Sequence, residues 1–345
     1  MLGCKAVVLG SSGFAGAELL RLLTGHPEIE VVAASASSQV GRAISGAHPN
    51  LHGYGEMRFV SPEDALLEPA DIVFASLPHT QSMKLLATLQ LPKVIDLGGD
   101  FRLRDPALYP AWYGEEHPYP ERLSEWAYGL TEWHRPELTQ ADRVANPGCY
   151  PVASILALGP LLAEGIVSPD GIHIDAKSGA SGAGRAGGEG FDFASANENV
   201  RPYTPTGHKH IPEIEQELSA IAGVKVMVSF VPHLVPMTRG ILVTCAARAA
   251  AEADTDEVVE ILRDRYRGER FVRVLDRGSL PETKRLAGTN LAEVTARADP
   301  RTGRVLAFAA IDNLGKGAAG QALQNANLML GFDEGAGLEA RGMLP

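Results

Sequence analysis

The sequence predicts an α/β fold, with a parallel-sheet domain followed by an α+β domain whose sheet is mixed or antiparallel. Three observations predict it. The 345 residues are enough for roughly two domains of ~150 residues each. Early in the chain, continuous apolar runs are separated by segments with helical spacing, which is typical of a parallel sheet covered on both faces. Later runs alternate apolar and polar residues, as half-buried strands do.

The chain opens with a strand–turn–helix–strand unit. An apolar run ends at Gly10, and residues 15–23 then carry apolar side chains at the spacing of an amphipathic helix. Further apolar runs follow at intervals that leave room for helices between them. The strands predicted for the parallel sheet are residues 6–9, 29–34, 72–75 and 94–96.

A glycine motif lies in the first turn. Gly10, Gly13 and Gly16 form the pattern G-x-x-G-x-x-G between a predicted strand and a predicted helix. Glycine lets the backbone approach a pyrophosphate closely, and the helix N-terminus offers N–H donors to it. We therefore expect residues 1–148 to be a Rossmann-type dinucleotide-binding domain, although an ordinary tight turn can have the same pattern. The expected cofactor contacts in this turn are Gly10, Ser12, Gly13, Phe14, Ala15 and Gly16.

The end of the second predicted strand indicates which nicotinamide cofactor binds. Enzymes that use NAD place a carboxylate there to bind the ribose hydroxyls. This chain instead has Ser35, Ser37 and Arg42 with no carboxylate between them, which fits the 2′-phosphate of NADP(H). The alternative is that Arg42 is a solvated loop residue. Leu77 and Pro78, after the third strand, are also expected to contact the cofactor.

One cysteine has the sequence context of a reactive thiol. Residues 103–143 are predicted to form long loops with short helices, and Cys149 follows them, after Asn-Pro-Gly and before Tyr-Pro and a helix at 152–162. The dipole at a helix N-terminus stabilises a thiolate. Cys4 and Cys245 lie beside or within apolar strands and are expected to be packing residues. The alternative for Cys149 is a buried small side chain.

A nucleophilic cysteine needs a group that accepts its proton. His208 and His210, in Gly-His-Lys-His, are the candidates, and the sequence leaves open which of them acts. A metal pair is the rival interpretation. Neither Cys-x-x-Cys nor His-Glu-x-x-His stands nearby, so no metal site is expected.

The second half of the chain predicts the α+β domain, at residues 149–314. A segment rich in Gly, Ser and Ala at 178–190 is predicted to be a functional loop. The last predicted helix is expected to return, with residues 315–345, to complete the first domain. The predicted strands are 172–176, 224–231, 240–250 and 305–311, and the predicted helices are 255–266 and 318–330.

Composition excludes several classes of protein. The 31 Lys and Arg against 42 Asp and Glu give a net charge of −11, which is unfavourable for nucleic acid or an anionic membrane. No apolar run approaches the ~20 residues of a membrane span. The three cysteines do not suggest a disulfide framework. A cytoplasmic location is therefore expected.

Six motifs together carry a family resemblance. The chain resembles the N-acetyl-gamma-glutamyl-phosphate reductase family, which belongs with the aspartate-semialdehyde dehydrogenases, and the motifs span nearly the whole chain in the family's order. The resemblance implies NADPH-dependent reduction of N-acetyl-L-glutamyl 5-phosphate to N-acetyl-L-glutamate 5-semialdehyde and inorganic phosphate in arginine biosynthesis. The motifs are Gly10–Gly16, Asp100–Leu103, Asn146–Pro151, Ser178–Arg185, Gly207–His210 and Ala310–Gly317.

The resemblance also implies roles for single residues. Cys149 matches the nucleophile that forms a thioester, and His208 or His210 transfers the proton. The loop with Ser178, Gly179 and Gly182 lies near the nicotinamide, and Asn313 belongs to the segment that returns to the cofactor. Arg102, Arg185 and Lys209 are the expected contacts of the anionic acyl-phosphate substrate. A homodimer or homotetramer is expected.

The chain departs from the family pattern at two places. Val152 stands where the family usually has Thr, and the run after Arg185 is richer in glycine than in relatives. Three alternatives follow: aspartate-semialdehyde dehydrogenase, the aminoadipyl-phosphate reductase of lysine biosynthesis, and a non-catalytic NADP-binding sensor. Residues 333–345 have no assigned role.

Overall fold

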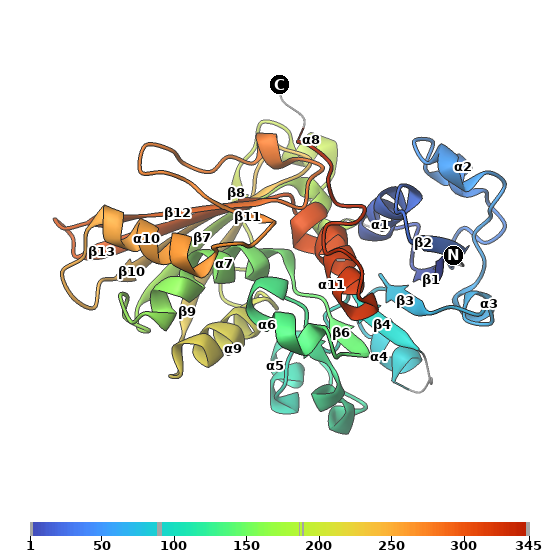
Figure 1. The fold of residues 1–345 in the computed structure, drawn as a ribbon, viewed down its shortest axis with the longest axis horizontal. Coiled ribbons are helices and arrows are strands. Elements are labelled where there is room, and N and C mark those ends of the chain that lie inside the picture. The colour runs from blue at the N-terminus through green and yellow to red at the C-terminus, as the bar shows by residue number, and fades with distance from the viewer. Residues whose placement is uncertain (1–2, 88–91, 186, 188–189, 343–345) are drawn as a thin grey trace.

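The structure is a computed structural model that describes residues 3–87, 92–185, 187 and 190–342. Two sheets lie side by side, and the last helix lies between them (Figure 1). The first sheet has six parallel strands in the order β2-β1-β3-β4-β6-β5, which confirms the predicted parallel sheet. Its strands are β1 (Cys4–Leu9), β2 (Ile29–Ala34), β3 (Ile72–Ala75), β4 (Lys93–Asp96), β5 (Ala127–Tyr128) and β6 (Arg143–Ala145).

Helices cover both faces of this sheet. On one face α1 (Phe14–Thr24) and α11 (Gly320–Leu330) bury Leu20 and Leu323 in one cluster with Val8 and Phe74 of the strands. On the other face α4 (Gln81–Leu86) packs with aromatic side chains that come from the segment after β4. Both faces are therefore apolar, which explains why these strands have continuous apolar runs.

Residues 103–143 contain short helices, as predicted, and also the strand β5. Charged side chains leave little apolar periodicity in this stretch, so β5 was not predicted. The shorter helices of the chain are α2 (Ile44–Ala47), α3 (Pro62–Ala65), α5 (Tyr109–Tyr113), α6 (Thr131–Leu138) and α8 (Phe193–Ala196). The 3₁₀ turns are His52–Tyr54, Pro106–Leu108, Pro120–Glu125, Ala180–Ala183 and Lys284–Leu286.

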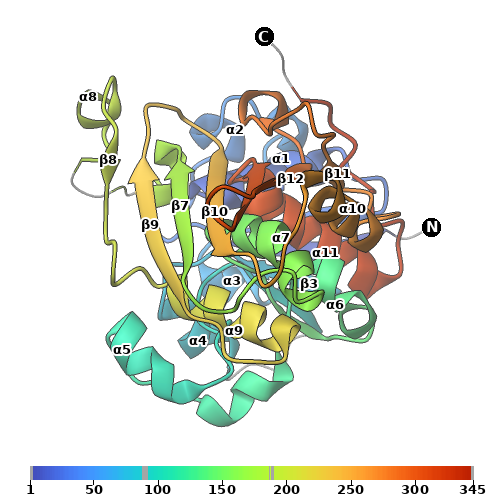
Figure 2. The same cartoon turned by 90° about the vertical axis from the view of Figure 1, so that its left-hand side faces the viewer.

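The second sheet is mixed and has seven strands in the order β11-β12-β13-β10-β7-β9-β8. The pairs β11–β12 and β7–β9 are parallel, and the others are antiparallel. Figure 2 shows β9, β7 and β10 side by side. The strands are β7 (Ile172–Ser178), β8 (Arg201–Pro202), β9 (Val228–Leu234), β10 (Ile241–Arg248), β11 (Val272–Val274), β12 (Ala292–Asp299) and β13 (Arg304–Ile311).

One strand prediction in this domain is corrected, and one long strand was missed. The strand predicted at 224–231 is β9, which begins at Val228 because α9 (Ile211–Ala222) ends at Gly223, with φ of 67°, and the chain needs several residues to reach the sheet edge. The strand β12 was not predicted, because glutamate, threonine and arginine interrupt its apolar pattern. It pairs with β13 along eight residues.

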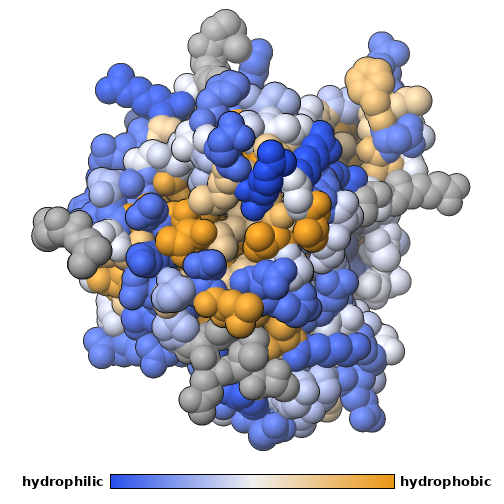
Figure 3. Space-filling model, turned by 90° about the vertical axis from the view of Figure 1, so that its right-hand side faces the viewer, coloured by the Kyte–Doolittle hydropathy of each residue, from blue (hydrophilic) through white to orange (hydrophobic). Residues whose placement is uncertain are grey.

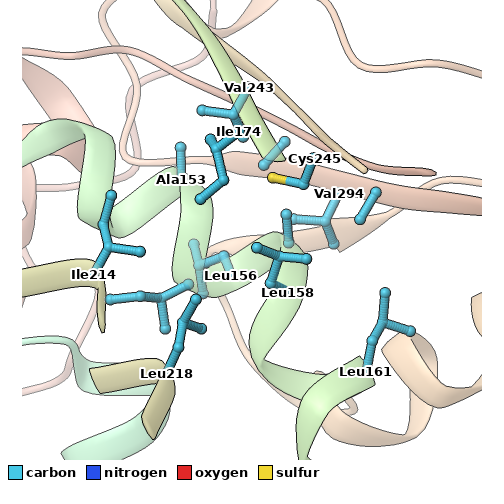
Figure 4. Close-up of a cluster of buried hydrophobic side chains, with 14 of the residues drawn as sticks. Ala153, Leu156, Leu158, Leu161, Ile174, Ile214, Leu218, Val243, Cys245 and Val294 are labelled. Carbon is cyan, nitrogen blue, oxygen red and sulfur yellow. The ribbon is translucent and has the colours of Figure 1, made fainter. Parts of the chain in front are cut away.

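Helix α7 (Cys149–Ala163) lies at the centre of the second domain. Its residues Tyr150–Leu162 are all buried, as is typical of a helix that is apolar all round. Figure 4 shows Leu156 and Leu158 of α7 packed between strand side chains such as Val243 and the side chain of Leu218 from α9. The helix α10 (Thr255–Arg265) completes this layer. The start of α7 is therefore held firmly by a large core.

The chain returns to the first domain after β13. A π-helical turn at Gly315–Ala319 leads directly into α11. Lys316 in this turn forms a fully buried ion pair with Glu132 of α6, at 2.6 Å between Nζ and Oε1. Lys316 also donates to Gln324 in α11. These contacts fix the turn against the first domain.

The face that the N-terminal elements present is mostly hydrophilic, with apolar side chains gathered near its middle (Figure 3). Among the described residues, no helix is both long and apolar enough for a transmembrane segment.

Candidate active site

Cys149 is the first residue of α7, and it faces a cavity of about 370 Å³ where the two domains meet. Its side chain is half-buried. Burial raises the pKa of the thiol to about 11, although the nearby positive charge of Arg102 acts in the opposite direction. The thiol is therefore protonated near pH 7, so its reaction requires a group that accepts the proton.

His210 lies against the start of α7. A Cβ atom on Gly148 would overlap with Nε2 of His210, so only glycine at this position leaves room for the imidazole beside the start of α7. His210 is buried, and its Nδ1 atom has no hydrogen-bond partner among the described residues. Burial lowers its pKa well below the usual value, so the ring is neutral and can accept a proton.

His208 has a different environment. Its Nδ1 accepts a hydrogen bond from the backbone N–H of His210 at 3.2 Å, and its ring packs edge-on against Tyr150 and Tyr203. Burial, together with the charge of Lys209, lowers its pKa to about 4. Both histidines line the cavity, but the contact with Gly148 belongs to His210.

A buried carboxylate connects the start of α7 with Tyr128 and Arg102. It was not among the residues expected from the sequence. Glu213, in the first turn of α9, accepts hydrogen bonds from the N–H of Gly148 at 2.8 Å and from the hydroxyl of Tyr128 at 2.7 Å. It also pairs with Arg102, at 3.4 Å between Nη1 and Oε2. Its spacing of three residues from His210 is the one signal in the sequence, since that spacing places both at the start of one helix.

Arg102 and Lys209 are the expected anion contacts that line the cavity. Arg102 donates from Nε to the carbonyl oxygen of Asn146 at 2.8 Å and from Nη2 to that of Leu97 at 2.9 Å. These bonds fix the guanidinium beneath the Cys149 segment. Burial lowers the pKa of Lys209. Together with the N-terminus of α7, they make the cavity suited to an anion.

A groove over the glycine motif continues into this cavity. Phe14, Ala15, Leu77 and Pro78 line both spaces. Gly10 has φ of +70°, and a Cβ atom there would overlap with the carbonyl oxygen of Ser76. Only glycine therefore fits between the turn and the backbone of Ser76, which keeps the turn tight at the floor of the groove, as a dinucleotide-binding turn requires. Gly10, Ser12, Gly13 and Ser37 also line the groove.

Three of the cofactor contacts expected in and after the glycine turn do not line the groove. Gly16 packs against the turn itself, since a Cβ atom there would lie 2.6 Å from the oxygen of Gly10. Ser35 is fully buried, and its Oγ accepts a hydrogen bond from the N–H of Gly10 at 3.2 Å. Arg42 is exposed and donates to the carbonyl oxygen of Gly46. Gly16 and Ser35 therefore contact Gly10 on the side of the turn away from the groove and support its conformation.

The predicted functional loop after β7 closes one side of the cavity. Ser178 and Gly182 line it, as does Asn313. Asn313 donates to Ser181 Oγ at 3.0 Å and accepts from the N–H of Gly240 at 2.7 Å, so it joins this loop to the end of β13. Gly179 lies behind, against the backbone of Thr238. Residues 186, 188 and 189 of this loop lie outside the described residues.

Arg185 lies in a different place from the one expected for a substrate contact. Its guanidinium lies 5.3 Å from the centre of the Phe14 ring, and Nη2 lies 3.4 Å from Nδ1 of His48. It lines the dinucleotide groove, and it is not among the described residues that line the Cys149 cavity. The sequence around Arg185 is rich in glycine and does not indicate toward which of the two spaces its side chain points.

The cavity also contains His79, which follows β3 and packs against the ring of Tyr113, with 4.4 Å between ring centres. Its Nδ1 pairs with Asp100. Across the described residues, no group of three or more His, Cys, Asp or Glu side chains is arranged to hold a metal ion.

The chain matches two family profiles along almost its whole length. The profile described as "Semialdehyde dehydrogenase, NAD binding domain" matches residues 5–141, and "Semialdehyde dehydrogenase, dimerisation domain" matches residues 149–313. A curated protein of Desulforudis audaxviator named N-acetyl-gamma-glutamyl-phosphate reductase is 48% identical over 99% of both chains. One of the same name from Pelotomaculum thermopropionicum is 47% identical over 100% of both.

The chain belongs to the N-acetyl-gamma-glutamyl-phosphate reductase family.

Solved structures place this member of the reductase family in a wider fold group. Aspartate semialdehyde dehydrogenase II of Vibrio cholerae is similar with a TM-score of 0.71 at 19% identity, over 95% of this chain and 98% of that one. The Candida albicans enzyme, solved with NADP, has a TM-score of 0.64 at 17% identity, again over 95% and 98%. These likenesses confirm the predicted fold class.

Proposed function

We propose that this reductase converts N-acetyl-L-glutamyl 5-phosphate to N-acetyl-L-glutamate 5-semialdehyde and phosphate, with NADPH as the reductant, in arginine biosynthesis. The observation that carries the proposal is that Cys149 and His210 line one cavity, with His210 against Gly148, and that this cavity continues into the dinucleotide groove. The names of the curated relatives support the choice of acyl group.

The first step forms a thioester. Nε2 of His210 accepts the proton of the Cys149 thiol, because the ring is neutral and lies against the start of α7. The sulfur attacks the carbonyl carbon of the acyl phosphate, a C–S bond forms and the C–O bond to phosphate breaks. Phosphate leaves with the electron pair and takes the proton from His210.

The second step reduces the acyl carbon. NADPH, when bound in the groove, supplies the hydride. The tetrahedral centre then collapses, the C–S bond breaks, and the thiolate of Cys149 takes up a proton through His210. Arg102 and the N-terminus of α7 stabilise the negative charge that develops on the oxygen.

The structure supports different anionic partners for the three expected cations. We assign Arg102 and Lys209 to the acyl phosphate, since both line the Cys149 cavity. Arg185 is assigned to the cofactor side, since it lines the groove beside Phe14. Among the described lining residues of this groove there is no carboxylate, and Ser37 and Ser38 offer hydroxyls, which supports NADP(H).

The organisation of the chain follows the same proposal. Residues 1–148 with 315–345 form the cofactor domain, and 149–314 form the catalytic domain that joins subunits in a homodimer or homotetramer. The enzyme works in the cytoplasm. The match of 149–313 to a dimerisation domain supports the assembly.

The test is an assay in the reverse direction with the purified protein. N-acetyl-glutamate semialdehyde, phosphate and NADP⁺ should produce NADPH, and omission of phosphate should stop it. Aspartate semialdehyde should react at least ~100-fold more slowly, because it lacks the N-acetyl group. A site that hydrogen-bonds a polar group of its substrate strongly rejects an analogue without that group. Faster turnover of aspartate semialdehyde, or equal use of NADH, would contradict the proposal.

The variant Cys149→Ala checks the covalent step. It removes the nucleophile and leaves the dinucleotide groove unchanged, so turnover should be abolished while NADPH binding, measured by fluorescence, stays within about twofold. Substantial residual turnover would exclude the thioester. If the unaltered protein binds NADPH but reduces none of the acyl phosphates, it is instead a non-catalytic sensor.

A further inference from the structure

Arg239 joins the two domains beside the active site. It lies between β9 and β10, and its guanidinium contacts two buried carboxylates. Nη1 and Nη2 bind the two oxygens of Glu18 at 3.1 and 2.8 Å. Nε and Nη2 bind the two oxygens of Asp312 at 3.1 and 2.8 Å. Two bidentate pairs on one planar group leave it little freedom to rotate.

The first of these carboxylates belongs to the dinucleotide helix. Glu18 lies in α1, one turn after Phe14, which lines both the groove and the Cys149 cavity. Arg21 of the same helix binds Glu18 as well, at 2.7 Å. A displacement of α1 would therefore move Phe14, which lies where the groove continues into the cavity.

The second carboxylate belongs to the segment that supports Cys149. Asp312 Oδ1 accepts hydrogen bonds from the N–H groups of Leu314 at 2.9 Å and Gly315 at 3.3 Å. These residues begin the π-helical turn in which Gly317 packs on Cys149, so closely that a Cβ atom on Gly317 would lie 2.8 Å from that of Cys149.

The loop that carries Arg239 also holds the wall of the cavity. The carbonyl oxygens of Met237 and Thr238 accept the N–H groups of Ala180 at 2.9 Å and Ser181 at 3.1 Å. One short loop thus contacts the dinucleotide helix, the support of Cys149 and the functional loop after β7.

We propose that Arg239 is a positioning residue that sets the distance between the dinucleotide groove and Cys149, and so the geometry of hydride transfer. The proposal rests on the proposed function. Arg239 does not line the Cys149 cavity or the groove among their described lining residues, so it acts through Glu18 and Asp312. A displacement of about 1 Å between reacting groups can reduce a rate ~100-fold. Thioester formation instead depends on Cys149, His210 and Arg102, and the contacts of Arg239 given above are with none of these three.

The experiment separates these two steps in Arg239→Gln and Arg239→Lys. Thioester formation is measured without cofactor, as the burst of phosphate released from the acyl phosphate. NADPH affinity is measured by fluorescence titration, and reduction by single-turnover absorbance with NADPH and its 4-deuterated form. The matched control is Arg135→Gln, which also removes an arginine that joins two carboxylates, Glu269 and Glu334, but lies away from the site.

In Arg239→Gln we expect the phosphate burst within about twofold of the unaltered protein and single-turnover reduction at least ~30-fold slower, with a full deuterium effect. Arg239→Lys keeps the charge but not the two bidentate pairs, so it should be slowed at least ~5-fold. Arg135→Gln should change neither step. If Arg239→Gln does not fold, Arg239→Lys provides the same comparison.

Two results would overturn the proposal. One is reduction in both Arg239 variants at the rate of the Arg135→Gln control. The other is an equal loss of the burst and of reduction, which would make Arg239 a support of the fold alone. Absence of a burst in the unaltered protein would overturn the proposed function itself, and with it this role of Arg239.

Discussion

At the scale of single residues, the proposed pairing of Cys149 with His210 depends on the missing side chain of Gly148. Cys149 begins α7 and His210 immediately precedes α9, and the imidazole occupies the space that a Cβ atom on Gly148 would take. Sequence context singled out Cys149 as the candidate nucleophile, because the flanking residues that indicate it are local. It left two histidines open, because only the packing of α9 beside α7 determines which ring reaches the start of α7.

The two histidines should differ in their effect on thioester formation. His210→Gln removes the proton acceptor, so the phosphate burst should slow by ~100-fold or more, as is usual for loss of a general base. His208→Gln keeps an acceptor for the N–H of His210 and should slow it less than about fivefold. Stopped-flow phosphate release measures both. Similar losses in the two variants would contradict the assignment.

Asp96 predicts a pH-dependent stability. It is fully buried, and burial together with the charge of Asp100 raises its pKa to about 7. An unfolded Asp ionises near pH ~4, so between about pH 4 and 7 the unfolded chain binds fewer protons than the folded one. The contribution of Asp96 to the free energy of unfolding therefore falls as the pH rises through that window.

Asp96→Asn removes this titration. Relative to the unaltered protein, the variant should gain roughly 2–4 kcal/mol in free energy of unfolding between pH 4.5 and 8. Urea unfolding at both pH values measures it, with the exposed Asp142→Asn as control. Parallel pH dependences of Asp96→Asn and the unaltered protein would show that Asp96 is ionised in the folded state.

At the scale of elements, helices, strands and turns with a local sequence pattern were predictable. Elements and contacts that depend on pairing between distant segments were not. The glycine turn was found because three glycines and a following apolar helix stand together in the sequence. Strand β12 was missed because its partner β13, and not its own pattern, keeps it in the sheet. Glu213 and Arg239 were missed for the same reason, since their partners lie on other elements.

The glycine turn should be required for the cofactor and not for the thiol. Gly10→Ala forces a side chain into φ of +70° and against Ser76, at a cost of ~1–2 kcal/mol for the backbone alone. NADPH affinity should fall at least ~10-fold, while the phosphate burst remains. Gly25→Ala, where a Cβ atom meets nothing within 4 Å, is the control. Unchanged NADPH affinity in Gly10→Ala would contradict the placement of the dinucleotide.

At the scale of the whole molecule, a buried ion pair fastens the returning segment to the first domain. Lys316→Met would leave Glu132 buried without its partner and should cost about 3–5 kcal/mol in free energy of unfolding. Adding Glu132→Gln removes the charge and should recover at least half of the loss. Urea unfolding of the single and double variants tests this, and additive losses would contradict it.

The return of α11 to the parallel sheet also has a consequence for folding during synthesis. The face that α11 covers stays open while the intervening ~175 residues are translated, which takes roughly 10–35 s at ~5–20 residues per second. During that time the nascent sheet exposes the apolar surface that later contacts Leu323 and Ala326. We therefore expect this surface to remain accessible to chaperones until α11 emerges from the ribosome, and a chain released before that point to be cleaved more readily by proteases.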